Sequence, residues 1–379
     1  MVLPESQVNV YRYLYSGKGG ASLVTGGDLA LPTSVGREND VFPHNVMKYQ
    51  AVSIGDAVVD YFYSLEDAHL HANLDHLNKE LCLNYADKIP VKSVTHVPLA
   101  GNAANFAVGA KRLGIKTAFY TNVADDQLGR GMIDYMKKEG IGDDYIEINK
   151  GRETNVHAVL NFHGERTILV FHQQWTYKLP SLDAEWVYLS SVAEDHLNLH
   201  EDLLQQVKKK NVKLGFNPGT YQLRDGLRKL RPINELCEVF IVNKEEAQEL
   251  LELRAGTIKH MLVELKKEGP RIVVITDGQN GSFAYDGQFF YELEMFPGPR
   301  IEATGAGDSY STGFIVALMY GKDIAEAMAW GSINAQSVVA QIGPQAGLLT
   351  LRNMQKRVKA HPHFRAHKTP VGERIISTA

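Results

Sequence analysis

The chain has 379 residues, of which 44% are hydrophobic and 22% charged, and its formal net charge is -4. This composition is ordinary for a folded water-soluble protein, and without a basic excess it gives no support for nucleic-acid or membrane-surface binding. No run of about 18 or more apolar residues predicts a membrane-spanning helix, and no basic region followed by an apolar core predicts a secretory signal. The two cysteines, Cys82 and Cys237, are too few for a disulfide framework, so we expect a cytoplasmic setting.

Residues 1–47 differ in composition from the rest of the chain. They are rich in Gly, Ser and Pro and show no sustained hydrophobic period, which predicts an irregular N-terminal arm. The run SGKGG at residues 16–20 is not predicted to be a phosphate loop, because the remaining glycine and hydroxyl positions of that motif are missing and no buried strand precedes it.

From residue 48 onward, short apolar runs alternate with amphipathic segments. The strand-like runs are YQAVSIGDAVVDYFY, KTAFYTNVADD, AEWVYLSSV, VKLGFNPGT, EVFIVNKEE and RIVVITDGQ. Segments with helical spacing, such as GRGMIDYMKKEGI, EDLLQQVKKK and IKHMLVELKKEG, fall between most of them. This alternation predicts an α/β fold, with a mostly parallel central sheet that carries helices on both faces.

Two segments break this alternation and predict antiparallel hairpins. They are NVHAVLNFHGERTILVFH at 155–172 and GSFAYDGQFFYELEMF at 281–296. We expect the first to form a small β lid over the active face, built from parts of 61–98 and 154–173. The main domain is predicted to span 48–351, and 352–379 to be a C-terminal tail that begins as a helix and ends loose.

Histidines gather in EDAHLHANLDHLN, at positions 69, 71 and 76. No two of them have the i, i+4 spacing that places a pair of metal ligands on one helical face. A solvated polar helix near the lid is therefore predicted in preference to a metal site.

The run ATGAGDSYSTGF at 303–314 predicts a helix that begins with uncovered backbone. Gly305, Ala306 and Gly307 leave their amides accessible, and free N–H groups at the positive end of a helix attract an anion. Asp308 follows in the first turn. It either complements the helix dipole or acts as a general base beside a phosphate site, and the flanking glycines favour the second interpretation.

This run resembles the C-terminal signature of the ribokinase-like (PfkB) carbohydrate kinase family, and AGNAANFAVGAKRLG at 100–114 resembles its N-terminal signature. The resemblance implies a ribokinase-like fold and transfer of the terminal phosphate of ATP to a hydroxymethyl group of a sugar or nucleoside. It implies that Asp308 is the catalytic base and that the amides of Gly305, Ala306, Gly307 and Asp308 form an anion hole.

The resemblance also implies a Mg²⁺ and nucleotide site. In IVNKEEAQELL, Asn243 and Glu246 have the family's N-x-x-E spacing, with Glu246 linked to the metal, although the same spacing is typical of a helix capping box. Both roles are compatible, because such a cap lies at the strand ends where ligands of α/β sheets bind. The remaining expected nucleotide contacts are Thr276, Gly278, Asn334 and Gly343.

The acceptor substrate is expected on the N-terminal side of the domain. The resemblance assigns Asp60 to sugar hydroxyls, with Asp56 as a weaker candidate, and Gly101, Asn102 and Asn105 to the same pocket. Arg166 matches a frequent residue of the lid turn, and its role stays open.

Some positions depart from the family pattern. Ala100 replaces a glycine, Asn217 stands where many members have Asp, and Glu302 and Ala303 replace Asp-Thr, which leaves activation by a monovalent cation open. The particular substrate also stays open, with a sugar or nucleoside without a phosphate favoured. A homodimer formed through lid hairpins, as in part of the family, is compatible with the sequence.

Two other functions can be weighed. A non-catalytic nucleotide- or sugar-binding protein on a kinase fold is the alternative, motivated by the N-terminal arm and the departures from the pattern. A dehydrogenase is disfavoured, because no predicted strand is followed by G-x-G-x-x-G and a later acid.

Overall fold

The computed structural model describes residues 47–72 and 79–372. The chain divides into two units, 1–45 and 46–379, and all the elements below belong to the second unit. The predicted N-terminal arm therefore lies outside the described residues, apart from Met47 at its end.

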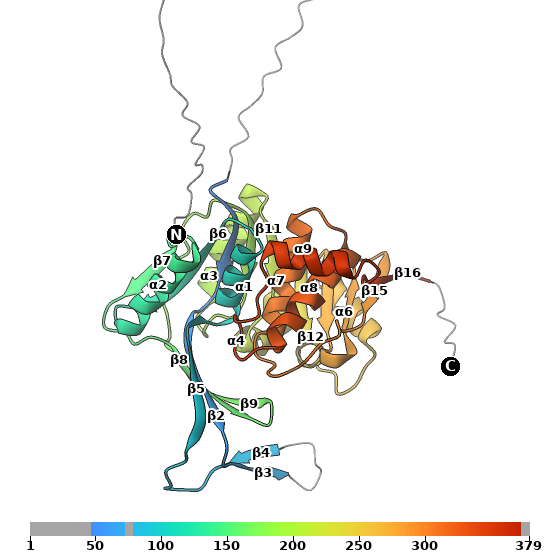
Figure 1. Ribbon diagram of the computed structural model, residues 1–379. Coiled ribbons are helices and arrows are strands. Elements are labelled where there is room, and N and C mark those ends of the chain that lie inside the picture. Colours follow the sequence, from blue (N-terminus) through green and yellow to red (C-terminus); the bar gives the residue numbers. More distant parts are fainter. Residues whose placement is uncertain (1–46, 73–78, 373–379) are drawn as a thin grey trace, which may run out of the picture. The chain divides into compact units, whose positions relative to one another are not determined.

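Ten strands form one large sheet (Figure 1). In spatial order they are β16 (His367–Pro370), β15 (Phe289–Leu293), β14 (Ser282–Tyr285), β13 (Ile272–Thr276), β12 (Cys237–Asn243), β11 (Lys213–Phe216), β10 (Ala184–Leu189), β1 (Tyr49–Ile54), β6 (Thr117–Ala124) and β7 (Ile146–Asn149). From β13 to β7 all neighbours pair in parallel, whereas β14, β15 and β16 add antiparallel strands at one edge. The prediction of a mostly parallel sheet is confirmed.

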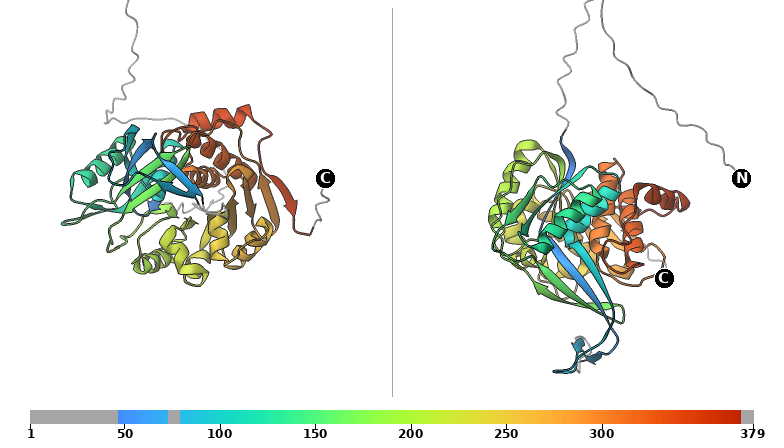
Figure 2. Two further views of the ribbon diagram at one scale, coloured as in Figure 1. Left: turned by 90° about the horizontal axis from the view of Figure 1, so that it is seen from below. Right: turned by 60° about the vertical axis from the view of Figure 1, so that its left-hand side comes forward.

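Helices cover both faces of this sheet (Figure 2). They are α1 (Asn102–Arg112), α2 (Gln127–Glu139), α3 (Leu197–Lys210), α4 (Thr220–Asn234), α5 (Lys244–Leu250), α6 (Ile258–Lys267), α7 (Ala306–Met319), α8 (Ile324–Val339) and α9 (Leu351–Ala360). In β10, Val187 and Leu189 join the apolar core with α3–α6, whereas Trp186 and Tyr188 join the core with α1, α7, α8 and α9. Burial of both faces explains why these strands are continuous apolar runs.

A second sheet of four strands forms the lid. Its order is β5 (Val91–Ala100), β2 (Val58–Leu65), β8 (Val156–Phe162) and β9 (Glu165–Phe171). The predicted hairpin of β8 and β9 is confirmed, and its two-residue turn, His163-Gly164, has positive φ at both positions, as tight hairpins require. The second predicted hairpin is formed by β14 and β15.

The helix predicted around the histidine cluster is wrong. His69 and His71 lie on β3 (His69–Ala72), which pairs with β4 (Lys79–Cys82), beyond the far ends of β2 and β5 in Figure 1, and His76 lies outside the described residues. The described side chains of β3 are exposed, so no apolar stripe is buried that would favour a helix. Within residues 47–72 and 79–372, no group of three or more His, Cys, Asp or Glu side chains is placed to hold a metal ion.

The C-terminal segment begins with the expected helix, α9, and continues into β16, whereas its last residues, 373–379, for which a loose end was predicted, lie outside the described residues. β16 pairs with β15 and is the edge strand of the large sheet, so the chain stays part of this domain through Pro370. Among the helices of the described segments, none is both long and apolar enough to cross a bilayer.

Candidate active site

The first turn of α7 presents open backbone amides. Its N-cap, Gly305, is in the left-handed region at φ 78°, and a Cβ there would lie 2.5 Å from Cβ of Pro344, so only glycine fits. No side chain caps this end of the helix. Within the described residues, the amides of Gly307 and Asp308 have no protein acceptor, and free amides at the positive end of a helix dipole can attract an anion.

Asp308 lies in that first turn with 8% of its surface exposed. The Asn105 side-chain amide donates to Asp308 Oδ2 at 2.8 Å. Burial raises the pKa of Asp308 to about 6, while the Asn105 hydrogen bond and the charge of Arg166 act in the opposite direction. A carboxylate with such a pKa is largely ionised at neutral pH and can still accept a proton, as a general base must.

A polar cavity of about 270 Å³ lies against this helix end. Among the predicted site residues, it is lined by Asp60, Gly101, Asn102, Asn105, Asn243, Glu246, Thr276, Gly305, Ala306, Gly307 and Asp308. β12 and β13 end at Asn243 and Thr276, so the cavity lies at the carboxyl ends of parallel strands, where ligands of open α/β sheets bind.

A second, more apolar cavity of about 160 Å³ adjoins the first. Its lining includes Gly278 and the apolar side chains of Met295, Ala335 and Val339. The two cavities share Thr276, Ala303, Ala306 and Gly307. The start of α7 therefore separates a polar compartment from an apolar one.

The lid contributes ionisable side chains that the sequence did not single out together. His157 Nδ1 on β8 lies 3.2 Å from Asp60 Oδ1 on β2, because the parallel pairing of these strands sets the two residues side by side. The His157 ring stacks on His172 at 5.2 Å, and burial and the neighbouring His157 lower the pKa of His172 to about 4. Arg166 and Ile168 of β9 also line the polar cavity.

Three predicted residues do not line either cavity. The Asp56 carboxylate is buried, accepts from the Tyr177 hydroxyl at 2.8 Å and from the Ala193 amide at 2.9 Å, and its pKa is raised by burial to about 7. Asn334 is fully buried and donates to the backbone carbonyl of Ser309. Gly343 lies beyond the lining of both cavities, where its amide donates to Glu302.

Asn243 and Glu246 form a reciprocal capping box at the start of α5. Asn243 Oδ1 accepts from the Glu246 amide and Glu246 Oε2 from the Asn243 amide, each at 2.8 Å. Both residues nevertheless line the polar cavity, so the structural and the ligand-binding interpretation are compatible. Burial, together with the charge of Asp308, raises the pKa of Glu246 to about 7.

Glu302 has a structural role in the loop before α7. Its side chain is 1% exposed and accepts from both the amide and the hydroxyl of Thr304, and it also accepts from the Gly343 amide at 3.3 Å. These contacts hold the loop that leads into the first turn of α7.

A domain with free amides at a helix start, a buried carboxylate and a β lid at the carboxyl edge of a parallel sheet has the construction of a small-molecule kinase. Comparison with known proteins agrees with that class. The model of the pfkB family of carbohydrate kinases matches residues 69–351. The chain belongs to the pfkB family of carbohydrate kinases, and it is a phosphotransferase.

Among curated proteins, the chain is similar to the 5-dehydro-2-deoxygluconokinase of Geobacillus thermodenitrificans, with 28% identity over 71% of this chain and 88% of the relative. The enzyme of the same name from Bacillus subtilis is 26% identical over 69% of this chain and 87% of its own length.

Solved structures share the fold. The nucleoside kinase of Methanocaldococcus jannaschii superposes with a TM-score of 0.67 at 24% identity, covering 83% of this chain and 99% of that one. The ribokinase of Arabidopsis thaliana, solved with ribose and ATP, superposes with a TM-score of 0.68 at 18% identity over 83% and 99% of the two chains.

Proposed function

We propose that this enzyme transfers the terminal phosphate of ATP to a hydroxymethyl group of a sugar or nucleoside, with Asp308 as the general base. The observation that supports this most directly is the placement of the Asp308 carboxylate and the free amides of Gly307 and Asp308 at one cavity. The carboxylate takes the hydroxyl proton as the new bond forms. The amides stabilise the negative charge of the phosphoryl group in transfer.

In this proposal, the nucleobase of ATP and the acceptor substrate occupy different cavities. The apolar cavity, with Met295, Ala335 and Val339, suits a nucleobase. The phosphates then cross the shared start of α7 at Ala306 and Gly307, toward the polar cavity. There the carboxylate of Asp60 and the amide of Asn102 can hold acceptor hydroxyls, since these groups accept and donate hydrogen bonds in the directions that a polyol needs.

The residues present fit a Mg²⁺ ion. Glu246 presents its carboxylate to the polar cavity, and carboxylate oxygen is the donor that Mg²⁺ prefers. Burial raises the pKa of Glu246 to about 7, and a nearby cation would lower this pKa again because it favours the ionised carboxylate. When bound, the ion would neutralise charge on the ATP phosphates. Few protein ligands are needed, because Mg²⁺ keeps several waters and binds the phosphates themselves.

A sugar acid belongs among the first acceptors to test. The curated relatives carry the name of a kinase for a gluconate derivative, which has a carboxylate. In this chain Arg166 lines the polar cavity, and no carboxylate of the described segments lies within ion-pair distance of it. A guanidinium in this position can bind a carboxylate in two-pronged fashion.

The experiment is a screen for ADP release by the purified full chain with ATP and Mg²⁺, with neutral sugars, sugar acids, phosphosugars and nucleosides as acceptors. Turnover with one class, absent in Asp308→Asn, would support the proposal. No ADP release with any acceptor class, while ATP still binds, would contradict the proposal and favour a binding role without catalysis.

We also propose a homodimer formed through the outer face of the lid. The strand register places Tyr61, Leu160 and Leu169 on the face opposite Asp60, and Val94, Leu169 and Phe171 on this face are exposed by 54%, 57% and 46%. A second copy of the chain would cover this apolar surface, which adjoins β9, the edge strand of the lid sheet in the described part of the chain.

The molar mass in solution, measured by light scattering after size-exclusion chromatography, tests the dimer. The wild-type chain is expected at twice its own mass and Leu169→Lys at the monomer mass. Ile148→Lys, which changes a similarly exposed residue at the edge of the large sheet, is expected to leave the dimer intact. A wild-type monomer would show that this surface does not associate.

A cytoplasmic setting is also proposed, because Cys82 and Cys237 are both free thiols.

A further inference from the structure

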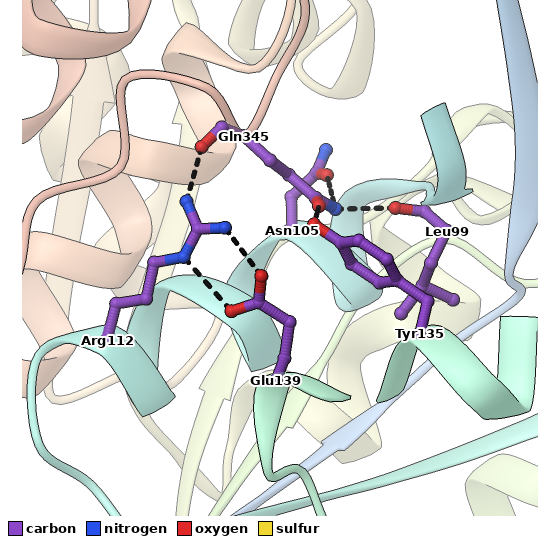
Figure 3. A network of polar contacts seen from close by, with 6 residues as sticks. All are labelled: Leu99, Asn105, Arg112, Tyr135, Glu139 and Gln345. Atoms are coloured by element: carbon purple, nitrogen blue, oxygen red, sulfur yellow. Dashed lines mark hydrogen bonds and ion pairs between the residues drawn. The ribbon is translucent and has the colours of Figure 1, made fainter. Parts of the chain in front are cut away.

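Behind the polar cavity lies a buried glutamine that the reaction itself does not use. Gln345 is in the segment between α8 and α9 and is 4% exposed. Its Nε2 donates to the Leu99 carbonyl at 2.6 Å and to Asn105 Oδ1 at 2.9 Å, and its Oε1 accepts from the Tyr135 hydroxyl at 3.2 Å (Figure 3). Both ends of the side-chain amide are therefore satisfied, and its orientation is fixed.

This orientation determines how Asn105 faces the candidate base. A backbone carbonyl can only accept, so the Leu99 contact identifies the Gln345 nitrogen, and that nitrogen can only donate to Asn105. Asn105 must then turn its oxygen toward Gln345 and its nitrogen toward Asp308, where Nδ2 donates to Oδ2 at 2.8 Å. The opposite rotamer would set an amide oxygen against a carboxylate.

A partly buried ion pair fixes the backbone of the same residue. Arg112, in the last turn of α1, donates through a terminal nitrogen to the Gln345 carbonyl at 2.6 Å. Its other nitrogens contact Glu139 of α2 at 2.7 and 3.1 Å, as Figure 3 shows. The side chains of this pair are 24% and 18% exposed. Such two-pronged geometry restricts the guanidinium more than a single contact would.

We propose that Gln345 is a positioning residue: it fixes the Asn105 amide so that it donates to Asp308, and the Arg112–Glu139 pair holds the Gln345 backbone for this purpose. The proposal deepens the proposed function and rests on it, since Asp308 is the base only if the chain is a kinase of that mechanism. The predicted consequence is electrostatic, because a donated hydrogen bond favours the ionised carboxylate.

Other ionisable groups face Asp308 and set the background for this effect. Arg166 and Asp60 approach from the lid, Glu246 from α5, and Tyr188 from β10. None of these residues shares a hydrogen bond with Gln345 in the described structure, so a change at Gln345 acts on Asp308 through Asn105.

The test is the titration of the Asp308 carboxyl, followed by ¹³C NMR of aspartate-labelled full chain and assigned as the signal missing in Asp308→Asn. In Gln345→Met, which keeps the length of the side chain and removes the amide, we expect the midpoint to move upward by at least about half a pH unit. The acid limb of kcat/KM should move in the same direction, with KM for ATP changed by less than about twofold.

Arg112→Met provides a second, milder variant, and we expect a smaller upward shift. Its matched control is Arg130→Met on α2, which removes an exposed ion pair with Asp125, before the helix, and should leave the midpoint in place. A folded Gln345→Met protein with an unchanged or lower midpoint overturns the proposal, even if activity falls. If the chain proves inactive, the proposed function fails, yet the NMR titration still decides whether Gln345 positions Asn105.

Discussion

The amide nitrogen of Asn105 lies 2.8 Å from Asp308 Oδ2, although the two residues are 203 positions apart in the sequence. This hydrogen bond connects the two sequence signatures, one at the start of α1 and the other at the start of α7. It also means that the residue expected to hold the acceptor substrate acts directly on the ionisation of the candidate base.

Replacement of Asp308 by Asn is expected to lower kcat by about 100-fold or more, because general-base catalysis of this kind contributes on that order. The side chain keeps its size, so the fold and ATP affinity should stay close to those of the wild type. ADP release and calorimetric ATP binding measure the two effects. Asp195→Asn, at an exposed position, is the matched control. Full activity in Asp308→Asn would show that Asp308 is not the general base.

The pH dependence of kcat/KM should show an acid limb with a midpoint near the pKa of Asp308, which burial raises to about 6. The base must be ionised to work, so activity is retained above this pH and falls below it. Rates measured between about pH 5 and pH 8 test this, with enzyme held at each pH and assayed again at neutrality to exclude unfolding. A midpoint at the ordinary pKa of an aspartate would contradict the buried site.

Gly307→Ala separates catalysis from stability. A Cβ at Gly307 meets no atom within 4 Å, so the methyl group fits the protein and should stabilise α7 by roughly 0.5–1 kcal/mol. The same methyl enters the space that both cavities share, where the phosphates are proposed to lie. We expect kcat/KM to fall by about 100-fold, on the scale of a lost anion-hole donor.

Urea unfolding and ADP release measure the two effects of this substitution together. Gly131→Ala, in α2, also adds a methyl group to open space and should leave activity unchanged. Undiminished activity in Gly307→Ala would place the phosphates elsewhere.

Much of this fold was predictable because its signals are local. Parallel strands buried on both faces are continuous apolar runs, and in β6 all eight residues are buried. The hairpin turn at His163-Gly164 is equally local. The polar segment with His69 and His71 has no such pattern, and its strand depends on pairing with β4, so a helix was predicted there wrongly.

The candidate site was predictable only in part. Asp308 and its glycines stand out in one short run, whereas Gln345 is meaningful only through contacts with Asn105 and Tyr135, more than 200 positions away. His157 lies beside Asp60 because of the register of two lid strands, and the hydrophobic period of the sequence does not indicate which strands pair. Asp56 is an acid near the end of a central strand, as expected for a residue that binds substrate hydroxyls, but its side chain points toward Tyr177 instead of the cavity.

Arg166→Gln tests whether the polar cavity holds an acidic sugar. If Arg166 binds a substrate carboxylate, KM for that acid should rise by about 10- to 100-fold, as expected for a lost hydrogen bond between charged groups. A comparison of a sugar acid with its neutral analogue gives the readout. Arg152→Gln, also exposed, is the matched control. A fall in kcat for all acceptors, with KM unchanged, would instead assign Arg166 to the phosphoryl group.

His200, which is remote from the candidate site, is expected to make the stability of the fold depend on pH. His200 is 5% exposed, and its Nε2 lies 3.1 Å from Nε2 of Gln222. The Gln222 oxygen accepts from the Gly219 amide, so its nitrogen is a donor, and His200 must accept as neutral imidazole. Burial, followed by the nearby His196, lowers the pKa of His200 to about 3.

The sign of the effect follows from this lowered pKa. Below about pH 6.5 the unfolded chain protonates His200 while the folded chain does not, so acidification favours unfolding. Between neutrality and about pH 5 this one group should lower the free energy of unfolding by roughly 2 kcal/mol. In His200→Gln, which can accept the same hydrogen bond but does not titrate, the loss over this range should be smaller by that amount. Urea unfolding at both pH values measures it, with His363→Gln as the exposed control, and an equal loss in His200→Gln and wild type would show that His200 is not held neutral by the fold.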